Sequence, residues 1–101
     1  MRVYELVRPD EQRPYAFEVS SSWSVFRPIG PFLESVPGVT QVRRGGHILS
    51  GDENRVCFLF HGVPFVVWEP WGDNSRYWIG PDDTKAPAPD IGPLIQAFRA
   101  Y

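Results

Sequence analysis

The sequence predicts an α+β fold: an antiparallel sheet of about five to six strands with two helices mainly on one face, in the order β-β-α-β-β-β-β-α. Three observations lead to this prediction. Short segments rich in branched and aromatic residues alternate with turn formers along most of the chain. Apolar residues at helical spacing occur in only two places. No regular series of long helices is present to carry the chain between parallel neighbours, so the strands must pair antiparallel.

The first segments predict a β-hairpin. Residues 2–8 have the composition of a strand, and residues 15–19 alternate apolar and polar side chains with a period of two. Between them, residues 9–14 supply two prolines and an Asp-Glu pair, which are typical of a turn. Three serines at positions 20–22 end the pattern. We therefore expect the two strands to be neighbours in the sheet.

Apolar residues three and four positions apart predict a short helix after the hairpin; they are Val25, Ile29, Phe32, Leu33 and Val36. An interior proline breaks a helix, because it lacks the backbone N–H and clashes with the preceding turn. We therefore expect a turn near Ser24, then a helix that begins at Pro28 or Pro31 and ends before Pro37.

The middle of the chain predicts three of the remaining strands. Residues 39–43 form the first, and a polar, glycine-rich connection follows at 45–54. The segments 55–60 and 63–69 are separated only by His61 and Gly62, which is the length and composition of a tight two-residue hairpin. This turn pairs Phe60 with Val63, Phe58 with Phe65 and Val56 with Val67 on one face, and leaves Cys57, Leu59, Val66 and Trp68 on the other.

The C-terminal third predicts one more strand and a docked helix. Turn formers fill 70–75, and residues 76–79 resume a strand, so Trp68 and Trp78 approach each other across a second hairpin. A proline-rich linker at 84–89 then leads to a helix at 90–101. Asp90 is its expected cap and Pro93 lies in its first turn; Ile91, Leu94, Ile95, Phe98 and Tyr101 share one stripe.

Length and charge restrict the class of protein. The 101 residues fit one domain, 1–101, and 43% of them are hydrophobic, enough for one core. The net charge is −2 with no basic run, which disfavours nucleic acid and membrane surfaces as partners. The first residues contain no apolar run long enough for a signal peptide, and the single cysteine, Cys57, lies in an apolar strand. These features predict a cytoplasmic location.

The densest group of candidate binding residues is the aromatic hairpin at 68–78. Tryptophan, tyrosine and arginine dominate binding hot spots, because they make large contacts at small entropic cost. Sheet packing is the simplest interpretation of Trp68, Tyr77 and Trp78, which lie in strands. In the turn, Asp73 and Asn74 also suit local side-chain hydrogen bonds, whereas Trp71 and Arg76 have no packing role to explain them. The candidate binding residues are therefore those of the turn: Glu69, Trp71, Asp73, Asn74 and Arg76.

No pattern in the sequence indicates catalysis, a metal or a cofactor. Glu69, Asp73 and Arg76 form a charged set, but a structural Glu69–Arg76 salt bridge explains them better than acid–base chemistry. His47 and His61 are the only histidines and lack the spacing of metal ligands. The chain is therefore predicted to need no cofactor, and an enzymatic role is the less favoured of the two interpretations.

Two functional hypotheses follow. The first is a small interaction domain, with an inhibitor, immunity-type or adaptor role, that binds a protein partner or a second copy of itself through the turn at 69–76. The second is a small-ligand binder or minor enzyme with a pocket between sheet and helices, lined by Trp23, Phe58, Trp68 and Trp78, with Glu18, Glu69 or Arg76 at its mouth.

Overall fold

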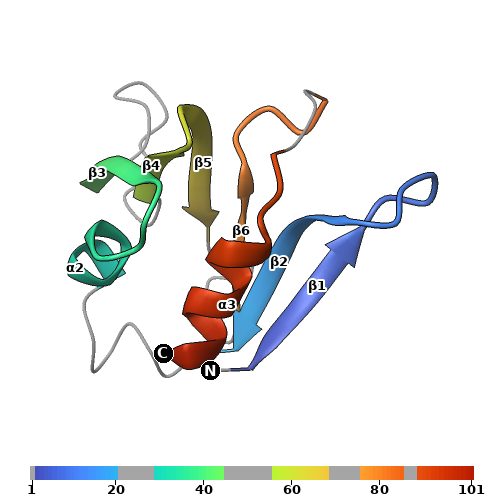
Figure 1. Cartoon of the computed structure of the whole chain (residues 1–101), viewed down its shortest axis with the longest axis horizontal. Helices are drawn as coiled ribbons and strands as arrows, with labels where there is room; N and C mark the ends of the chain where they lie inside the picture. The colour runs from blue at the N-terminus through green and yellow to red at the C-terminus, as the bar shows by residue number, and fades with distance from the viewer. Residues whose placement is uncertain (1, 21–28, 45–55, 69–75, 86–88) are drawn as a thin grey trace.

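The computed structural model describes residues 2–20, 29–44, 56–68, 76–85 and 89–101. This part of the chain forms one six-stranded antiparallel sheet and two helices, in the predicted order (Figure 1). The elements are β1 (Val3–Val7), β2 (Pro14–Ser20), α2 (Ile29–Glu34), β3 (Val39–Arg44), β4 (Val56–Phe60), β5 (Val63–Trp68), β6 (Arg76–Pro81) and α3 (Gly92–Ala100). The predicted fold class is confirmed.

The strands lie in the spatial order β1-β2-β6-β5-β4-β3. Strands β3 to β6 form a meander, in which each strand pairs with the next one along the chain. The hairpin of β1 and β2 joins this meander because β2 pairs with β6, for example Phe17 with Ile79. The edges of the sheet are therefore β1 and β3, and β5 and β6 lie at its centre.

The predicted two-residue hairpin between β4 and β5 is confirmed in turn and in register. His61 has φ of 50° and Gly62 has φ of 80°, as a type I′ turn requires at both central positions. Phe60 pairs with Val63, Phe58 with Phe65 and Val56 with Val67, as predicted. All but Val63 are buried, so this face of the hairpin belongs to the core.

Strand β3 contains a bulge that the sequence did not predict. Its pairing with β4 shifts between Thr40 and Arg43, and Gln41 there has φ of 52°. Thr40 and Arg43 are three positions apart, but because of the extra residue both lie on the same side of the sheet as their β4 partners, Leu59 and Cys57. Val42 is thereby left on the core side of the sheet.

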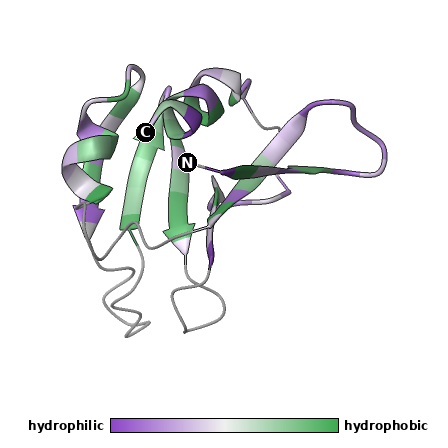
Figure 2. Cartoon of the chain, turned by 90° about the horizontal axis from the view of Figure 1, so that it is seen from below, coloured by the Kyte–Doolittle hydropathy of each residue, from purple (hydrophilic) through white to green (hydrophobic). Residues whose placement is uncertain are grey.

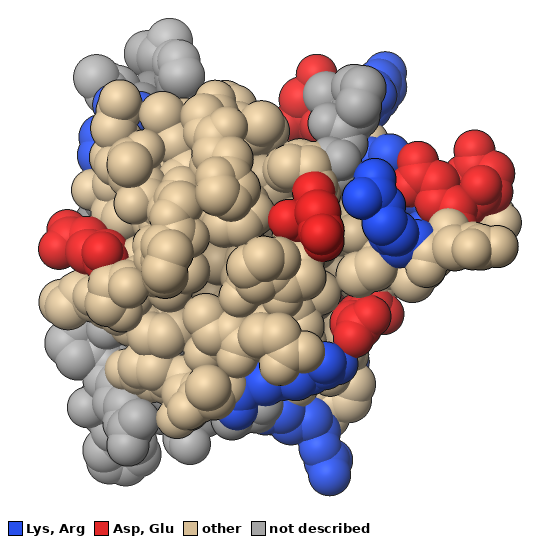
Figure 3. Space-filling view, viewed as in Figure 1, with Lys and Arg blue, Asp and Glu red and all other residues tan. Residues whose placement is uncertain are grey.

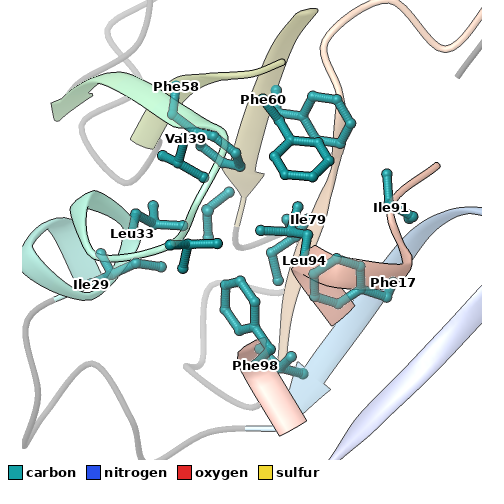
Figure 4. Packing of buried hydrophobic residues seen from close by; sticks show 14 of the residues in the cluster. Phe17, Ile29, Leu33, Val39, Phe58, Phe60, Ile79, Ile91, Leu94 and Phe98 are labelled. Atoms are coloured by element: carbon teal, nitrogen blue, oxygen red, sulfur yellow. The ribbon is translucent and has the colours of Figure 1, made fainter. Parts of the chain in front are cut away.

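The hydrophobic core lies on one face of the sheet, beneath both helices. Residues of both helices belong to the same buried cluster as alternate residues of the strands. In Figure 4 the labelled side chains of α2, α3 and the strands converge on one region. Figure 2 shows apolar residues concentrated in the strands and the inner sides of the helices, and polar ones on the β1–β2 hairpin. We call the opposite side of the sheet the open face.

Helix α3 carries the predicted apolar stripe but begins later than predicted. Its first residue is Gly92 and its cap is Ile91, which makes no side-chain capping bond. Asp90 lies one residue earlier, where its Oδ1 accepts a hydrogen bond from the Gly92 N–H at 2.9 Å. The carboxylate thus satisfies a free N–H near the helix start without being the cap. Four residues of the stripe are buried, namely Ile91, Leu94, Ile95 and Phe98. Tyr101 is partly buried and packs against the core cluster to which they belong.

Strand β6 is longer than the predicted 76–79. It continues through Gly80 and Pro81, which pair with Val66 and Phe65 of β5. The Asp82 N–H then donates to the Pro64 carbonyl at 2.9 Å and closes the ladder. Proline is tolerated here because it stands at the end of the strand, where no further ladder bond depends on its missing N–H.

Some predicted features lie outside the described residues, namely the turn near Ser24, the connection at 45–54 and positions 86–88 of the linker. The described part has a Cα radius of gyration of 12.8 Å, that of a compact domain of this size. None of the described helices has both the length and the apolar character needed to span a membrane.

Candidate functional site

Arg76 is the one predicted site residue that the structure describes. Glu69, Trp71, Asp73 and Asn74 lie outside the described residues, so their part in the predicted site stays a prediction. Arg76 is the first residue of β6 and lies opposite Ser20 of β2. Because side chains alternate along a strand and the buried Tyr77 faces the helices, Arg76 lies on the open face.

The Arg76 guanidinium contacts one side chain of the neighbouring strand β2 and one of β1, the next strand beyond it. Its Nη1 donates to Glu18 Oε1 at 3.1 Å, and its Cζ lies 4.0 Å from the centre of the Tyr4 ring. The ion pair is partly buried, with Glu18 18% and Arg76 40% exposed. Arginine stacked on an aromatic ring keeps its orientation, so the remaining N–H groups are held at the surface. The predicted partner Glu69 lies outside the described residues.

Tyr4 lies in a positive environment at this corner of the sheet. Hydrogen bonding from the Arg2 guanidinium is the largest cause that lowers the pKa of the Tyr4 phenol, and the charge of Arg76 acts in the same direction. Both effects favour the phenolate, because they stabilise negative charge on the oxygen. Arg2, Tyr4 and Arg76 therefore form a cluster of donors that favours an anionic group.

A row of three aromatic residues and one glutamate crosses four neighbouring strands of the open face. Tyr4 pairs with Glu18, Glu18 with Trp78 and Trp78 with Trp68, in four successive strands from β1 to β5. Directly paired residues point to the same side of a sheet. The predicted approach of Trp68 and Trp78 is thus confirmed. The other strand residues of the open face are Leu6, Ala16, Ser20, Arg76, Gly80, Val66, Pro64, Cys57, Leu59, Thr40 and Arg43.

Trp78 lies along the sheet surface over two small residues. A Cβ at Gly80 would come within 2.6 Å of Trp78 Cη2 and 2.7 Å of Ala16 Cβ. The six-membered ring of the indole therefore occupies the space above Gly80, beside Ala16. Ala16 and Gly80 are both buried although they are on the open face. Trp78 itself is half-buried.

Trp68 is exposed on the open face, which corrects its interpretation as a packed strand residue. It is 39% exposed, whereas Tyr77, interpreted in the same way, is 7% exposed and belongs to the core. The difference follows from register, because Trp68 is the last residue of β5 and points away from the helices. Only one other large apolar side chain of the described residues, Val7, is as exposed.

The structure does not bring together the residues predicted to line a pocket. Phe58 lies in the core, on the side of the helices, whereas Trp68 and Trp78 are on the open face. Trp23 lies outside the described residues. The sheet itself separates Phe58 from the two tryptophans, so these rings cannot line one cavity.

The open face combines apolar area with positive charge. Arg43 and Arg76 are its described strand cations and Glu18 is its strand carboxylate, while Arg2 precedes β1 and Asp82 follows β6. The view from the helix side differs: uncharged side chains cover most of that surface, and most charged ones lie along its border and on the β1–β2 hairpin (Figure 3). Among the described residues no group of three potential metal ligands exists. The arrangement is suited to binding.

Sequence reasoning missed the part that Arg2 and Tyr4 play in this cluster. Both belong to a segment interpreted only as a strand, and the contact with Arg76 depends on the pairing of β2 with β6. One signal was present, since Tyr4 shares its alternation with Arg2 and Leu6 on a single face. Without the strand order, however, nothing placed that face beside Arg76.

No protein-family model matches the chain, and neither a curated protein nor a solved structure is significantly similar.

Proposed function

We propose that this chain is an interaction domain that binds a protein partner through the open face of its sheet, together with the adjoining turn at 69–76. The observation that carries the proposal is the exposed Trp68 beside Trp78 on a face that neither described helix covers. Tryptophan and arginine are the residues most enriched in binding hot spots. Trp68 and Arg76 stand at the two ends of the turn, so the predicted turn residues would extend the same surface.

The composition of the surface supports a protein partner. Aromatic residues at the centre and charged residues at the rim are typical of protein interfaces, whereas small ligands need concave sites. The Trp78 ring fills the space above Gly80, and Arg76 is held near it by Glu18 and Tyr4. An inhibitor, immunity-type or adaptor role fits such a surface, and so does self-association.

Recovery of partners from a lysate tests the proposal. The tagged chain is compared with Trp68→Ala, Arg76→Ala and Trp71→Ala, and sedimentation of the purified protein tests self-association. Val7→Ala is the matched control, because Val7 is similarly exposed at 46% but lies at the end of the edge strand β1. We expect the Trp68 and Arg76 variants to lose a partner that the control keeps. Equal recovery by all folded variants would rule out this surface.

A further inference from the structure

The charge of the open face indicates the chemistry of its partner. Arg2, Arg43 and Arg76 stand on it against two described carboxylates, Glu18 and Asp82, which follows β6 opposite Pro64, although the whole chain carries a net charge of −2. Glu18 is already paired with Arg76 at 3.1 Å. A partner with carboxylates opposite these arginines would complement the face, and basic partners would be repelled.

The positions of the arginines define two ends of a binding strip. Arg76 and Arg43 are separated by three strand spacings across the sheet and by about four residues along it, which gives about 20 Å for a sheet of ordinary geometry. Between them the described open-face residues are apolar or uncharged, and the exposed Trp68 is among them. An extended segment covers this distance in about six residues.

The corner at Arg76 is built to receive a carboxylate. The Arg76 guanidinium lies 4.0 Å from the Tyr4 ring and hydrogen-bonds Glu18, so its orientation is fixed. Arg2 lies beside the same phenol, and hydrogen bonding from it lowers the pKa of Tyr4. Two guanidinium groups and a phenol O–H thus supply donors at one place, and arginine binds carboxylates with two parallel hydrogen bonds.

We propose that the open face binds an extended acidic segment of a partner protein, with one carboxylate at Arg2, Tyr4 and Arg76, apolar residues over Trp68, and a second carboxylate at Arg43. This inference rests on the proposed function and names the partner's chemistry. A nucleic-acid strand fits less well, because it carries a phosphate on every nucleotide, whereas the strip between the arginine ends has no described cation.

Titration with designed peptides, followed by amide and indole NMR signals, tests the inference. The first peptide has glutamates about six residues apart, with alternating leucine and serine between them. Two matched peptides replace both glutamates by glutamine or by lysine, and an oligothymidylate of similar length tests for nucleic acid. We expect the glutamate peptide to shift signals of Trp68, Trp78 and Arg76, and to bind at least about fivefold more tightly than the glutamine peptide.

Variants connect this preference to the proposed residues. We expect Arg2→Gln and Arg76→Gln each to weaken binding of the glutamate peptide about fivefold. Arg13→Gln, on the exposed β1–β2 turn, is the matched control and should bind unchanged. Equal affinity for all three peptides on the open face would overturn the acidic preference and leave the proposed function standing. Tighter binding of oligothymidylate, or no NMR shift with the glutamate peptide, would overturn the inference. The proposed function is then tested separately, by whether Trp68→Ala loses a partner in the lysate experiment.

Discussion

At the scale of single residues, glycine is required at two positions because nearby side chains occupy the space that a Cβ would need. Gly38 has φ of 90°, and a Cβ there would lie 2.7 Å from the His61 ring, whose backbone N–H donates to the Gly38 carbonyl. Gly80 has no unusual φ, but the space for its Cβ is filled by Trp78 and Ala16. Gly38 is needed both for its positive φ and for the space that the His61 ring occupies, whereas Gly80 is needed only for the space that Trp78 and Ala16 occupy.

Gly38→Ala should therefore destabilise the fold by about 2 kcal/mol, from strain at positive φ and from the collision with His61. Urea unfolding of the variant and the parent measures this difference. His61→Ala separates the two causes, because it removes the ring but leaves the backbone of Gly38 unchanged. In that background we expect Gly38→Ala to cost about half as much. An unchanged cost would mean that the ring makes no contribution.

Gly80→Ala should displace the Trp78 indole from the sheet surface and cost about 1 to 3 kcal/mol, because the new methyl group has no space. Tryptophan fluorescence and urea unfolding report the two effects. Gly80→Ala combined with Ala16→Gly is the matched control, since it moves the methyl group from β2 to β6 and keeps the number of methyl groups constant. We expect the double variant to recover part of the loss, and no recovery would show that the ring is held elsewhere.

The pKa of Tyr4 makes a small part of stability depend on pH. Arg2 and Arg76 lower the pKa of this phenol in the folded chain below its ordinary 10.0. Between the folded pKa and 10.0 the unfolded chain binds more protons, so stability from this group rises with pH across that range and is lost below it. NMR titration of Tyr4 should give a lowered pKa. Arg2→Gln should raise it more than Arg76→Gln does, and the reverse order would contradict this account.

At the scale of elements, α3 is held by aromatic contacts. The Phe98 ring centre lies 5.1 Å from that of Phe17 and 4.9 Å from that of Phe32, in edge-to-face arrangements, so it links the helix to β2 and α2. Tyr101 continues the cluster at 4.1 Å from Phe32. A helix of 9 residues is too short to be stable in isolation, so these contacts keep it folded.

Phe98→Ala should cost about 3 to 5 kcal/mol, a large share of the stability of a domain of this size. Circular dichroism during thermal unfolding measures the change, with Gln96→Ala on the exposed side of the same helix as the control. The control should stay within about 0.5 kcal/mol of the parent. If Phe98→Ala unfolded at the same temperature as the parent, α3 would not depend on this cluster.

Elements were predictable from the sequence wherever local chemistry decides them. The β4–β5 hairpin follows from His61 and Gly62, because only a tight turn fits two residues, and the α3 stripe follows from helical spacing. The bulge at Gln41 and the extension of β6 through Pro81 were missed, because both depend on the neighbouring strand. The same reason explains Trp68. Tryptophan suits a packed strand, and only the strand order shows that this side chain points away from the described helices.

At the scale of the whole molecule, the sheet order predicts where the fold is most protected. Strands β5 and β6 have hydrogen-bonded neighbours on both sides and lie at the centre, whereas β1 and β3 are edges. Amide hydrogen exchange should be slowest in β5 and β6 and fastest in β1, because central strands open only with the whole domain. Val67 and Val3 are suitable reporters. Faster exchange at Val67 than at Val3 would contradict this order.

The pairing of β2 with β6 also affects how the chain is made. Glu18 and Arg76 are 58 positions apart, whereas each strand from β3 to β6 finds its partner nearby in sequence. During synthesis, therefore, β2 emerges with Phe17 and Val19 exposed long before β6 can pair with its second edge. An apolar strand with one unpaired edge is a site for aggregation or chaperone binding. A chain stopped after residue 75 should accordingly associate with chaperones far more than the full chain, and equal association would show that the early hairpin protects itself.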